Sequence, residues 1–381
     1  MDFTINFYAL LPFLALLQAF VFAILLVIRG IRQERHSDFW LAALLMSLGL
    51  AGVPYMFGWL EIYMLWERFT FLPWDSAGYL TIPCCYMFLR SLVNEEWRFQ
   101  RKDLLYFGIF IAYFLYHSVV GLVGKDFATW WWRNIDNKFF IDYTFKAADM
   151  ILQVYLFVKM LQIYNAYRAW INSYFSDTER ISFVWFRNFL IIYFLNFIAT
   201  FAMIIFVAVT NYNYETMWWG YFLTMVFVYY LSIFGYSQVQ IHSIRFTQKE
   251  EIPNIESIEK EESSALKDLD VDFWKNKVLQ YFEREKPYLN PELKLSDVSQ
   301  QLKTNLNTLS AVINSGFAKN FNDFVNEYRI EEFKNQSQHK DNQHLTLLAI
   351  AFDCGFNSKT TFNRAFKKVV GSAPKEWIGS L

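Results

Sequence analysis

The first 245 residues of this 381-residue chain are dominated by apolar side chains. The whole chain is 55% hydrophobic and 20% aromatic, and the apolar excess is concentrated before Ser243. Seven stretches there approach or exceed the roughly 18 to 20 residues that a helix needs to cross a bilayer. They lie near residues 5–29, 38–60, 75–93, 103–123, 140–163, 185–210 and 217–242. The sequence therefore predicts an all-α membrane region, a bundle of seven transmembrane helices.

The distribution of Lys and Arg predicts how this bundle is oriented, because short cytoplasmic loops are enriched in them. Three alternate connections are basic and are expected in the cytoplasm; they hold Arg29, Arg32 and Arg35, then Arg90, Arg98, Arg101 and Lys102, then Lys159, Arg168, Arg180 and Arg187. The opposite connections hold only Arg68, then Lys125, Arg133 and Lys138. The predicted location is the inner membrane, with the N-terminus outside. Seven crossings then place Arg245 and everything after it in the cytoplasm.

The composition changes sharply after the last apolar stretch. Residues 246–270 carry an acidic excess and a helix-breaking Pro253, which is typical of a linker. A solvated spacer and a partly helical element that transmits a signal or pairs two chains are both compatible with it. The predicted domains are thus 1–245 in the membrane, the linker 246–270 and a cytoplasmic domain 271–381.

Residues 345–371 have the pattern of a helix-turn-helix. Thr346 is expected to cap a short helix, Gly355 to supply the turn, and the next helix to start near Ser358. On that second helix one face is expected to pack, formed by Phe362, Phe366 and Val369. Another face is free to touch DNA, formed by Thr360, Asn363, Arg364 and Lys367.

A second unit of the same kind lies upstream. Ser296 is expected to cap a helix that runs through Leu302, and a second helix follows from about 306 to 315. On this second helix Leu309, Val312 and Ile313 are predicted to point inward, and Asn307, Ser310, Ala311 and Asn314 outward. Between the units, a long connecting helix is predicted by the helical spacing of Phe321, Phe324, Val325 and Tyr328. Such a helix fixes the distance between the two readers, meaning the second, DNA-contacting helix of each helix-turn-helix unit.

An ordered series of residues across these units is specific enough to indicate a family. The series is Pro287-Tyr288-Leu289, Leu309-Ser310, Phe321, Asn326, Tyr328-Arg329-Ile330, Ala349-Ile350-Ala351, Gly355-Phe356-Asn357-Ser358, Phe362-Asn363-Arg364, Phe366-Lys367-Lys368, Gly371 and Pro374. Residues from about Asp272 to Leu381 resemble the DNA-binding domain of the AraC/XylS family of bacterial transcription regulators. The resemblance covers under a third of the chain.

The resemblance implies two helix-turn-helix units whose second helices enter successive major grooves of double-stranded DNA, about 34 Å apart. The base-reading candidates that it implies are Asn307, Ser310 and Ala311 in the first unit and Thr360, Asn363 and Arg364 in the second. The phosphate-contacting candidates are Asn305, Ser358, Lys359 and Lys367. Arg364 is the strongest candidate, because a guanidinium can bond bidentately to guanine O6 and N7. The first unit departs from the family at Ala311, which cannot hydrogen-bond a base, and at Ser299, where the family usually has a smaller Ala.

The membrane region offers three ionisable residues in its outer half: His117, Lys146 and Asp149. Ionisable groups inside a membrane are costly, which makes these three the candidates for sensing a signal. Lys146 and Asp149 are three residues apart on a helix, so a simple ion pair is the competing interpretation. Gln153 and Asn196 are expected to form hydrogen bonds between helices. A sensor role for an unidentified ligand is an inference by analogy with similar multi-span regions that precede AraC-type domains.

No phosphate-binding glycine loop or paired-His zinc motif occurs in the sequence, so we predict no catalytic residue, cofactor or metal. The predicted function is a membrane-anchored, sequence-specific transcription regulator. Its expected partners are DNA, the bilayer, RNA polymerase and an unknown signal ligand, and a homodimer is left open. The alternative is a transporter or channel with a regulatory DNA-binding tail, which solute flux in liposomes would reveal. A third interpretation is a scaffold that tethers a chromosomal locus without changing its transcription.

Overall fold

The computed structural model describes residues 7–53, 74–94, 97–178, 184–209, 214–237, 270–342 and 344–379. Every named element within these ranges is helical, as predicted. The linker as far as residue 269, the basic residues Arg68, Arg180 and Arg245, and the ends of the first, second, sixth and seventh predicted spans lie outside the described residues. The described chain forms two compact units, one with residues 7–163 and 184–237 and the other with residues 164–178 and 270–379.

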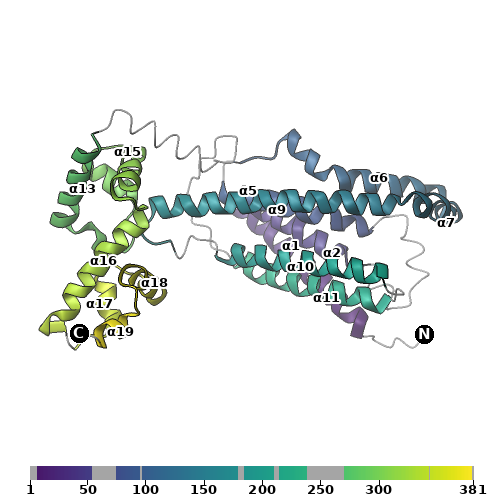
Figure 1. The fold of residues 1–381 in the computed structure, drawn as a ribbon. Coiled ribbons are helices and arrows are strands. Elements are labelled where there is room, and N and C mark those ends of the chain that lie inside the picture. Colours follow the sequence, from purple (N-terminus) through teal and green to yellow (C-terminus); the bar gives the residue numbers. More distant parts are fainter. Residues whose placement is uncertain are drawn as a thin grey trace. The chain divides into compact units, whose positions relative to one another are not determined.

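The first unit has a helical segment at each of the seven apolar stretches (Figure 1). These are α1 (Phe7–Gln33), α2 (His36–Leu50), η1 (Trp74–Leu80) with α5 (Thr81–Val93), η2 (Arg101–Phe107) with α6 (Gly108–Val123), α9 (Ile141–Tyr174), α10 (Val184–Val209), and α11 (Tyr214–Tyr230) with η4 (Leu231–Gly235). Three short helices join α6 to α9: α7 (Lys125–Trp131), η3 (Trp132–Asp136) and α8 (Asn137–Phe139).

Three helices among the described residues are long and apolar enough to cross a membrane, namely Leu10–Gln33, Arg101–Val123 and Ile141–Tyr174. The apolar helices Arg187–Ala202 and Tyr221–Gly235 are shorter. The helices therefore occur where the sequence places them, whereas seven complete crossings stay a prediction.

Contacts within the first unit bring together the helix ends that the sequence placed on one side. Arg29 near the end of α1 lies 2.7 Å from the carboxylate of Asp38 in α2 and also donates to the carbonyl of Tyr236 after η4. Arg90 near the end of α5 lies 2.8 Å from Asp103 in η2. At the opposite ends, the Tyr221 hydroxyl of α11 donates to the carbonyl of Leu48 in α2. The helices α1 and α11 therefore run in one direction and α2 between them runs in the opposite one.

Two polar side chains link neighbouring helices of the first unit as predicted. The hydroxyl of Tyr193 in α10 donates to the Gln153 Oε1 of α9 at 3.1 Å. The Asn196 amide of α10 lies 3.4 Å from the Thr224 hydroxyl of α11. Such bonds satisfy polar groups where the surroundings are apolar.

The second unit consists of short helices around one longer helix. They are α13 (Val271–Glu285), η5 (Pro287–Leu289), α14 (Leu295–Leu302), α15 (Leu306–Ala311) continuing as η6 (Val312–Gly316), α16 (Phe321–Gln338), η7 (Lys340–Asn342), α17 (Leu347–Asp353), α18 (Lys359–Val370) and α19 (Pro374–Gly379). Both helix-turn-helix units are present as α14–α15 and α17–α18. The helix α13 was not predicted from the sequence.

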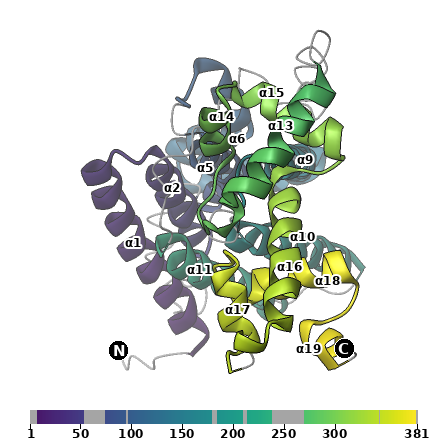
Figure 2. The same cartoon turned by 90° about the vertical axis from the view of Figure 1, so that its left-hand side faces the viewer.

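The helix α16 runs between the two helix-turn-helix units, as predicted for the connecting helix (Figure 2). It contributes side chains to two separate hydrophobic cores. The first core gathers Val278, Phe282, Tyr288, Leu293, Leu295, Val298, Leu302, Leu309, Ile313, Phe321, Phe324 and Val325. The second gathers Ile330, Phe333, Ile350, Ala351, Cys354, Phe356, Phe362, Ala365 and Phe366. One helix thus supplies side chains to both cores and links the two helix-turn-helix units.

The helix starts of the second unit confirm the predicted cap at Thr346 and the predicted helix start near Ser358, and they correct the predicted cap at Ser296. The Thr346 hydroxyl accepts from the Ala349 amide and caps α17, and Ser358 caps α18 in the same way. Ser296 does not cap α14: that helix begins one residue earlier, and Asp297 accepts from the backbone amide of Lys294 instead. A carboxylate within the first turn satisfies a free amide there as well as a preceding serine would.

The packed face of α18 also differs from the prediction at one position. Phe362 and Phe366 are buried, but Val369 is 36% exposed and Val370 packs on the second core instead. Gly371 in the left-handed conformation ends the helix directly after Val370, so the last apolar contact moves by one residue.

A buried guanidinium holds the turns of the second unit together. Arg329 of α16 is only 1% exposed. Its Nε donates to the carbonyl of Tyr288 at 2.8 Å, and its Nη2 donates to the carbonyl of Asn290 at 2.8 Å and to the hydroxyl of Ser176 at 3.2 Å. Burial lowers the pKa of Arg329 to about 10, against the opposite effect of Asp177, so the side chain stays charged at neutral pH.

Gly355 in the second helix-turn-helix packs directly on that region. Its φ is +94°, in the left-handed range that disfavours other residues. A Cβ added there would lie 2.4 Å from the carbonyl oxygen of Tyr288 and 3.0 Å from that of Leu289. The turn between α17 and α18 therefore needs a glycine both for its backbone conformation and for its approach to η5.

We expect Gly355→Ala to destabilise residues 347–370 by about 2 kcal/mol or more, because it combines backbone strain with a clash against a main-chain oxygen. Gly371→Ala is the matched control: its φ is +89° but no atom lies within 4 Å of the added Cβ. It should cost only the strain, about 1 kcal/mol. Amide hydrogen exchange of the full chain in detergent would measure both, and equal losses would contradict the close contact.

Arg329→Lys should destabilise the same unit by about 1.5 to 3 kcal/mol, because an ammonium cannot reach the three acceptors that the planar guanidinium serves. Arg284→Lys is the control, since that side chain is 83% exposed, and should change stability by less than about 0.5 kcal/mol. Hydrogen exchange of α16 is the measurement. A neutral result for Arg329→Lys would mean that charge alone, and not geometry, holds these turns.

Candidate nucleic-acid interface

The outer face of α18 presents the second set of predicted DNA contacts to solvent. Thr360, Asn363, Arg364 and Lys367 are all exposed, whereas Thr361, Phe362, Ala365 and Phe366 on the opposite face are buried. Arg364 forms no ion pair with any described residue, so its guanidinium is free to turn toward a ligand. The helical spacing of the sequence thus gave the correct exposed face.

The start of α18 adds backbone and side-chain donors to this face. Ser358 is half-buried, and its hydroxyl accepts from the Thr361 amide at 3.1 Å, so it is engaged as the helix cap. Lys359 follows and is exposed. Free amides and a cation at a helix start favour an anion such as a phosphate group. The positions of Ser358 and Lys359 fit the predicted phosphate contacts, which stay predictions.

The first recognition helix differs from its prediction. Asn307 is exposed, but Ser310 is only 4% exposed and Ala311 is fully buried, so their predicted outward orientation is wrong. The reason is that α13, α14 and α16 all pack against α15 and its continuation η6, so this short segment is covered on more than one face. Neither Ser310 nor Ala311 presents surface to a base in this conformation.

Asn305 occupies in α15 the position that Ser358 occupies in α18. It is the N-cap residue, and its Oδ1 accepts from the Thr308 amide at 2.7 Å. The residue itself is exposed, and the two caps thus mark equivalent points of the two units. The start of α15 exposes Asn305, Leu306 and Asn307, none of which is charged, whereas α18 exposes Lys359, Arg364 and Lys367. The attraction for a polyanion is therefore stronger at the second helix-turn-helix, α17–α18.

The three predicted sensor residues are not gathered into one site. Lys146 is exposed on α9 and forms no ion pair with Asp149, which corrects the predicted simple pairing. His117 of α6 lies 3.3 Å from Asp142 of α9 instead. Asp149 is 8% exposed, and its Oδ2 accepts from Gln153 at 2.6 Å. A spacing of three residues allowed the pair, but Asp149 faces the bundle and Lys146 does not.

A polar chain lies inside the first unit, and the sequence indicated only part of it. It runs from Asp149 through Gln153 to Tyr193 of α10. In the described part of the chain, Asp149 Oδ1 is buried without a hydrogen-bond partner. The seven-residue spacing of Asp142 and Asp149, which puts both on one face of α9, was the available signal. Tyr193 had no signal, because its partner lies 40 residues away.

Comparison with known proteins bears on the second unit alone. Residues 298–380 match a family model described as a helix-turn-helix domain, of the AraC type. The match starts inside α14 and includes α15 to α19, so it covers both recognition helices. Neither the curated proteins nor the solved structures gave a match. The C-terminal part of this chain is therefore similar to helix-turn-helix domains of the AraC type, and this similarity supports a DNA-binding role in transcription regulation.

Proposed function

We propose that this chain is a membrane-anchored transcription regulator that binds specific DNA sequences and is controlled by a signal received in its membrane region. The observation that carries the DNA-binding part is the exposed face of α18, with Arg364 between Thr360 and Lys367 and a core-packed face behind it. The helix-turn-helix match over residues 298–380 supports the same conclusion.

Membrane anchoring is supported by the outer surface of the first unit. Leu105, Leu122 and Ile151 are 81%, 74% and 72% exposed, and among residues 101–123 only Asp103 and Tyr113 are buried in the chain itself. A water-soluble protein rarely exposes such continuous apolar surface, whereas lipid would cover it. The basic helix ends at Arg29 and Arg90 fit a cytoplasmic side.

Signal reception is proposed for the polar chain of Asp149, Gln153 and Tyr193. A buried carboxylate with one unbonded oxygen is costly in apolar surroundings, and it offers a bonding site to a ligand or a proton. The proposal also includes RNA polymerase as a further partner and a homodimer. Both rest on the family resemblance alone.

Replacing Arg364 tests the DNA-binding proposal. We expect Arg364→Ala, in the full chain in lipid nanodiscs, to lower affinity for a site enriched from genomic DNA by about tenfold or more, because a bidentate guanine contact is lost. Affinity for random DNA should fall much less. Lys367→Ala is the control and should weaken both DNAs alike, with a salt dependence reduced by about one phosphate contact. Equal losses on both DNAs for Arg364→Ala would contradict sequence reading by α18.

Replacing Asp149 tests signal reception. We expect Asp149→Asn to change transcription of the chain's target genes in cells at least about twofold, because it removes the buried charge that the proposed signal would engage. Lys146→Gln, one helical turn away and exposed, should leave those transcripts unchanged. Transcript sequencing compares the two variants with the parent chain. Identical profiles for all three would contradict a sensor at this polar chain.

A further inference from the structure

A short segment that follows α9 is built into the second unit. Residues 174–178 directly continue α9, whose part up to Ile163 belongs to the first unit. Ser176 is fully buried and Thr178 is 5% exposed, although they lie in a connection between two helices. Tyr174 packs on the first core, and Phe175 pairs with Lys294 as an isolated antiparallel bridge. Burial of this kind is typical of a docked segment and unusual for a surface loop.

Ser176 takes part in four hydrogen bonds, through its backbone amide, its hydroxyl and its carbonyl. Its amide and its hydroxyl both donate to the carbonyl of Leu293, at 3.2 Å and 2.7 Å. Its hydroxyl accepts from Arg329, and its carbonyl accepts from the side-chain amide of Asn322 at 2.7 Å. Leu293 immediately precedes α14, while Arg329 and Asn322 lie on α16. One residue thereby connects the entry to the first helix-turn-helix with the connecting helix.

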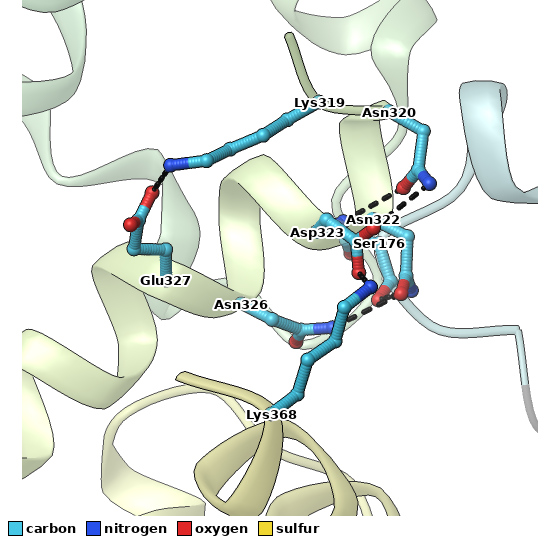
Figure 3. A network of polar contacts seen from close by, with 8 residues as sticks. All are labelled: Ser176, Lys319, Asn320, Asn322, Asp323, Asn326, Glu327 and Lys368. Carbon is cyan, nitrogen blue, oxygen red and sulfur yellow. Dashed lines mark hydrogen bonds and ion pairs between the residues drawn. The ribbon is translucent and has the colours of Figure 1, made fainter. Parts of the chain in front are cut away.

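The contacts of the segment also reach the second helix-turn-helix. The amide of Asn357, just before the cap of α18, donates to the carboxylate of Asp177 at 2.9 Å and lies 3.3 Å from the carbonyl of Pro291. Figure 3 shows the polar contacts at the start of α16, where Asn322 bonds to Ser176 and Asn326. Lys368 of α18 lies 2.6 Å from Asp323 there. The segment therefore touches the entry to one reader, the start of the other and the helix between them.

We propose that residues 174–178 are a coupling segment: docked, they hold the two recognition helices in the relative placement that a two-element DNA site requires, and their release loosens it. This inference rests on the proposed function, since it concerns how that function is regulated. The docked segment leaves Thr360, Asn363 and Arg364 exposed, so docking and DNA contact are compatible. Because α9 is one helix as far as Tyr174, a change in its membrane part has a covalent route to this segment.

The expected consequence is specific to two-element DNA. Two readers held in a fixed relation bind the second element as an intramolecular event, whereas a loosened pair loses part of that advantage. A DNA with a single element uses one reader and does not report on their spacing. The ratio of the two affinities therefore measures the coupling, and it cancels any general change in charge or in folding yield.

The test uses the full chain in lipid nanodiscs with a duplex carrying two enriched elements about one helical turn apart and a duplex carrying one. Ser176→Ala removes the hydroxyl's bonds to Leu293 and Arg329. It should lower the two-element to one-element affinity ratio by about threefold to tenfold. Ser173→Ala is the matched control, because the Ser173 hydroxyl bonds only back to its own helix at Ala169, and it should leave the ratio unchanged.

Asp177→Ala is a second variant, which removes the carboxylate that accepts from Asn357 and leaves the Ser176 hydroxyl in place; it should lower the ratio in the same direction. Hydrogen exchange without DNA reports docking itself: the Ser176 amide should be protected in the parent chain and less protected in Ser176→Ala. A fast-exchanging Ser176 amide in the parent chain, or an unchanged ratio in both variants, would overturn the coupling. A protected amide in a parent chain that selects no DNA sequence would instead refute the proposed function, and the coupling role with it.

Discussion

The buried guanidinium of Arg329 is the interaction on which the second unit depends. A charged group without water needs acceptors on all sides, and here they are two main-chain carbonyls of the turn after α13 and the hydroxyl of Ser176. These acceptors come from parts of the chain that are far apart in sequence. Satisfying one cation thus fixes η5, the loop before α14 and the segment after α9 against α16. Gly355 then packs on the same turn.

The two readers built on this framework are chemically unequal. The helix α18 exposes Lys359, Asn363, Arg364 and Lys367 along one face, and its opposite face packs on the second hydrophobic core. The helix α15 packs against α14, its continuation η6 packs against α13 and α16, and the start of α15 exposes no charged group. A protein with two such readers would draw most of its attraction for DNA from α18, while α15 would contribute placement in the adjacent groove. This inequality makes the fixed relation between the readers more important than the contacts of either one.

How much the sequence predicted depends on the range of the interactions involved. Periodic apolar patterns predicted α16, α18 and the seven helical stretches, because a helix face is a local property. The cap at Thr346 and the helix start near Ser358 were equally local. The burial of Ser310 and Ala311 was missed because it depends on packing against other helices, which the periodicity of one helix does not show. The docking of Ser176 was missed because its partners lie more than 100 residues away, at Leu293, Asn322 and Arg329.

The central claim is that one chain is held in the membrane while its C-terminal unit binds particular DNA sequences. The most direct measurement is to cross-link DNA to the tagged chain in intact cells, isolate the membrane fraction and sequence the DNA that copurifies. A small number of discrete sites, each lost with Arg364→Ala, is the predicted result. Uniform genomic coverage that the substitution does not alter, or recovery of the DNA-bound chain only from the soluble fraction, would contradict the account.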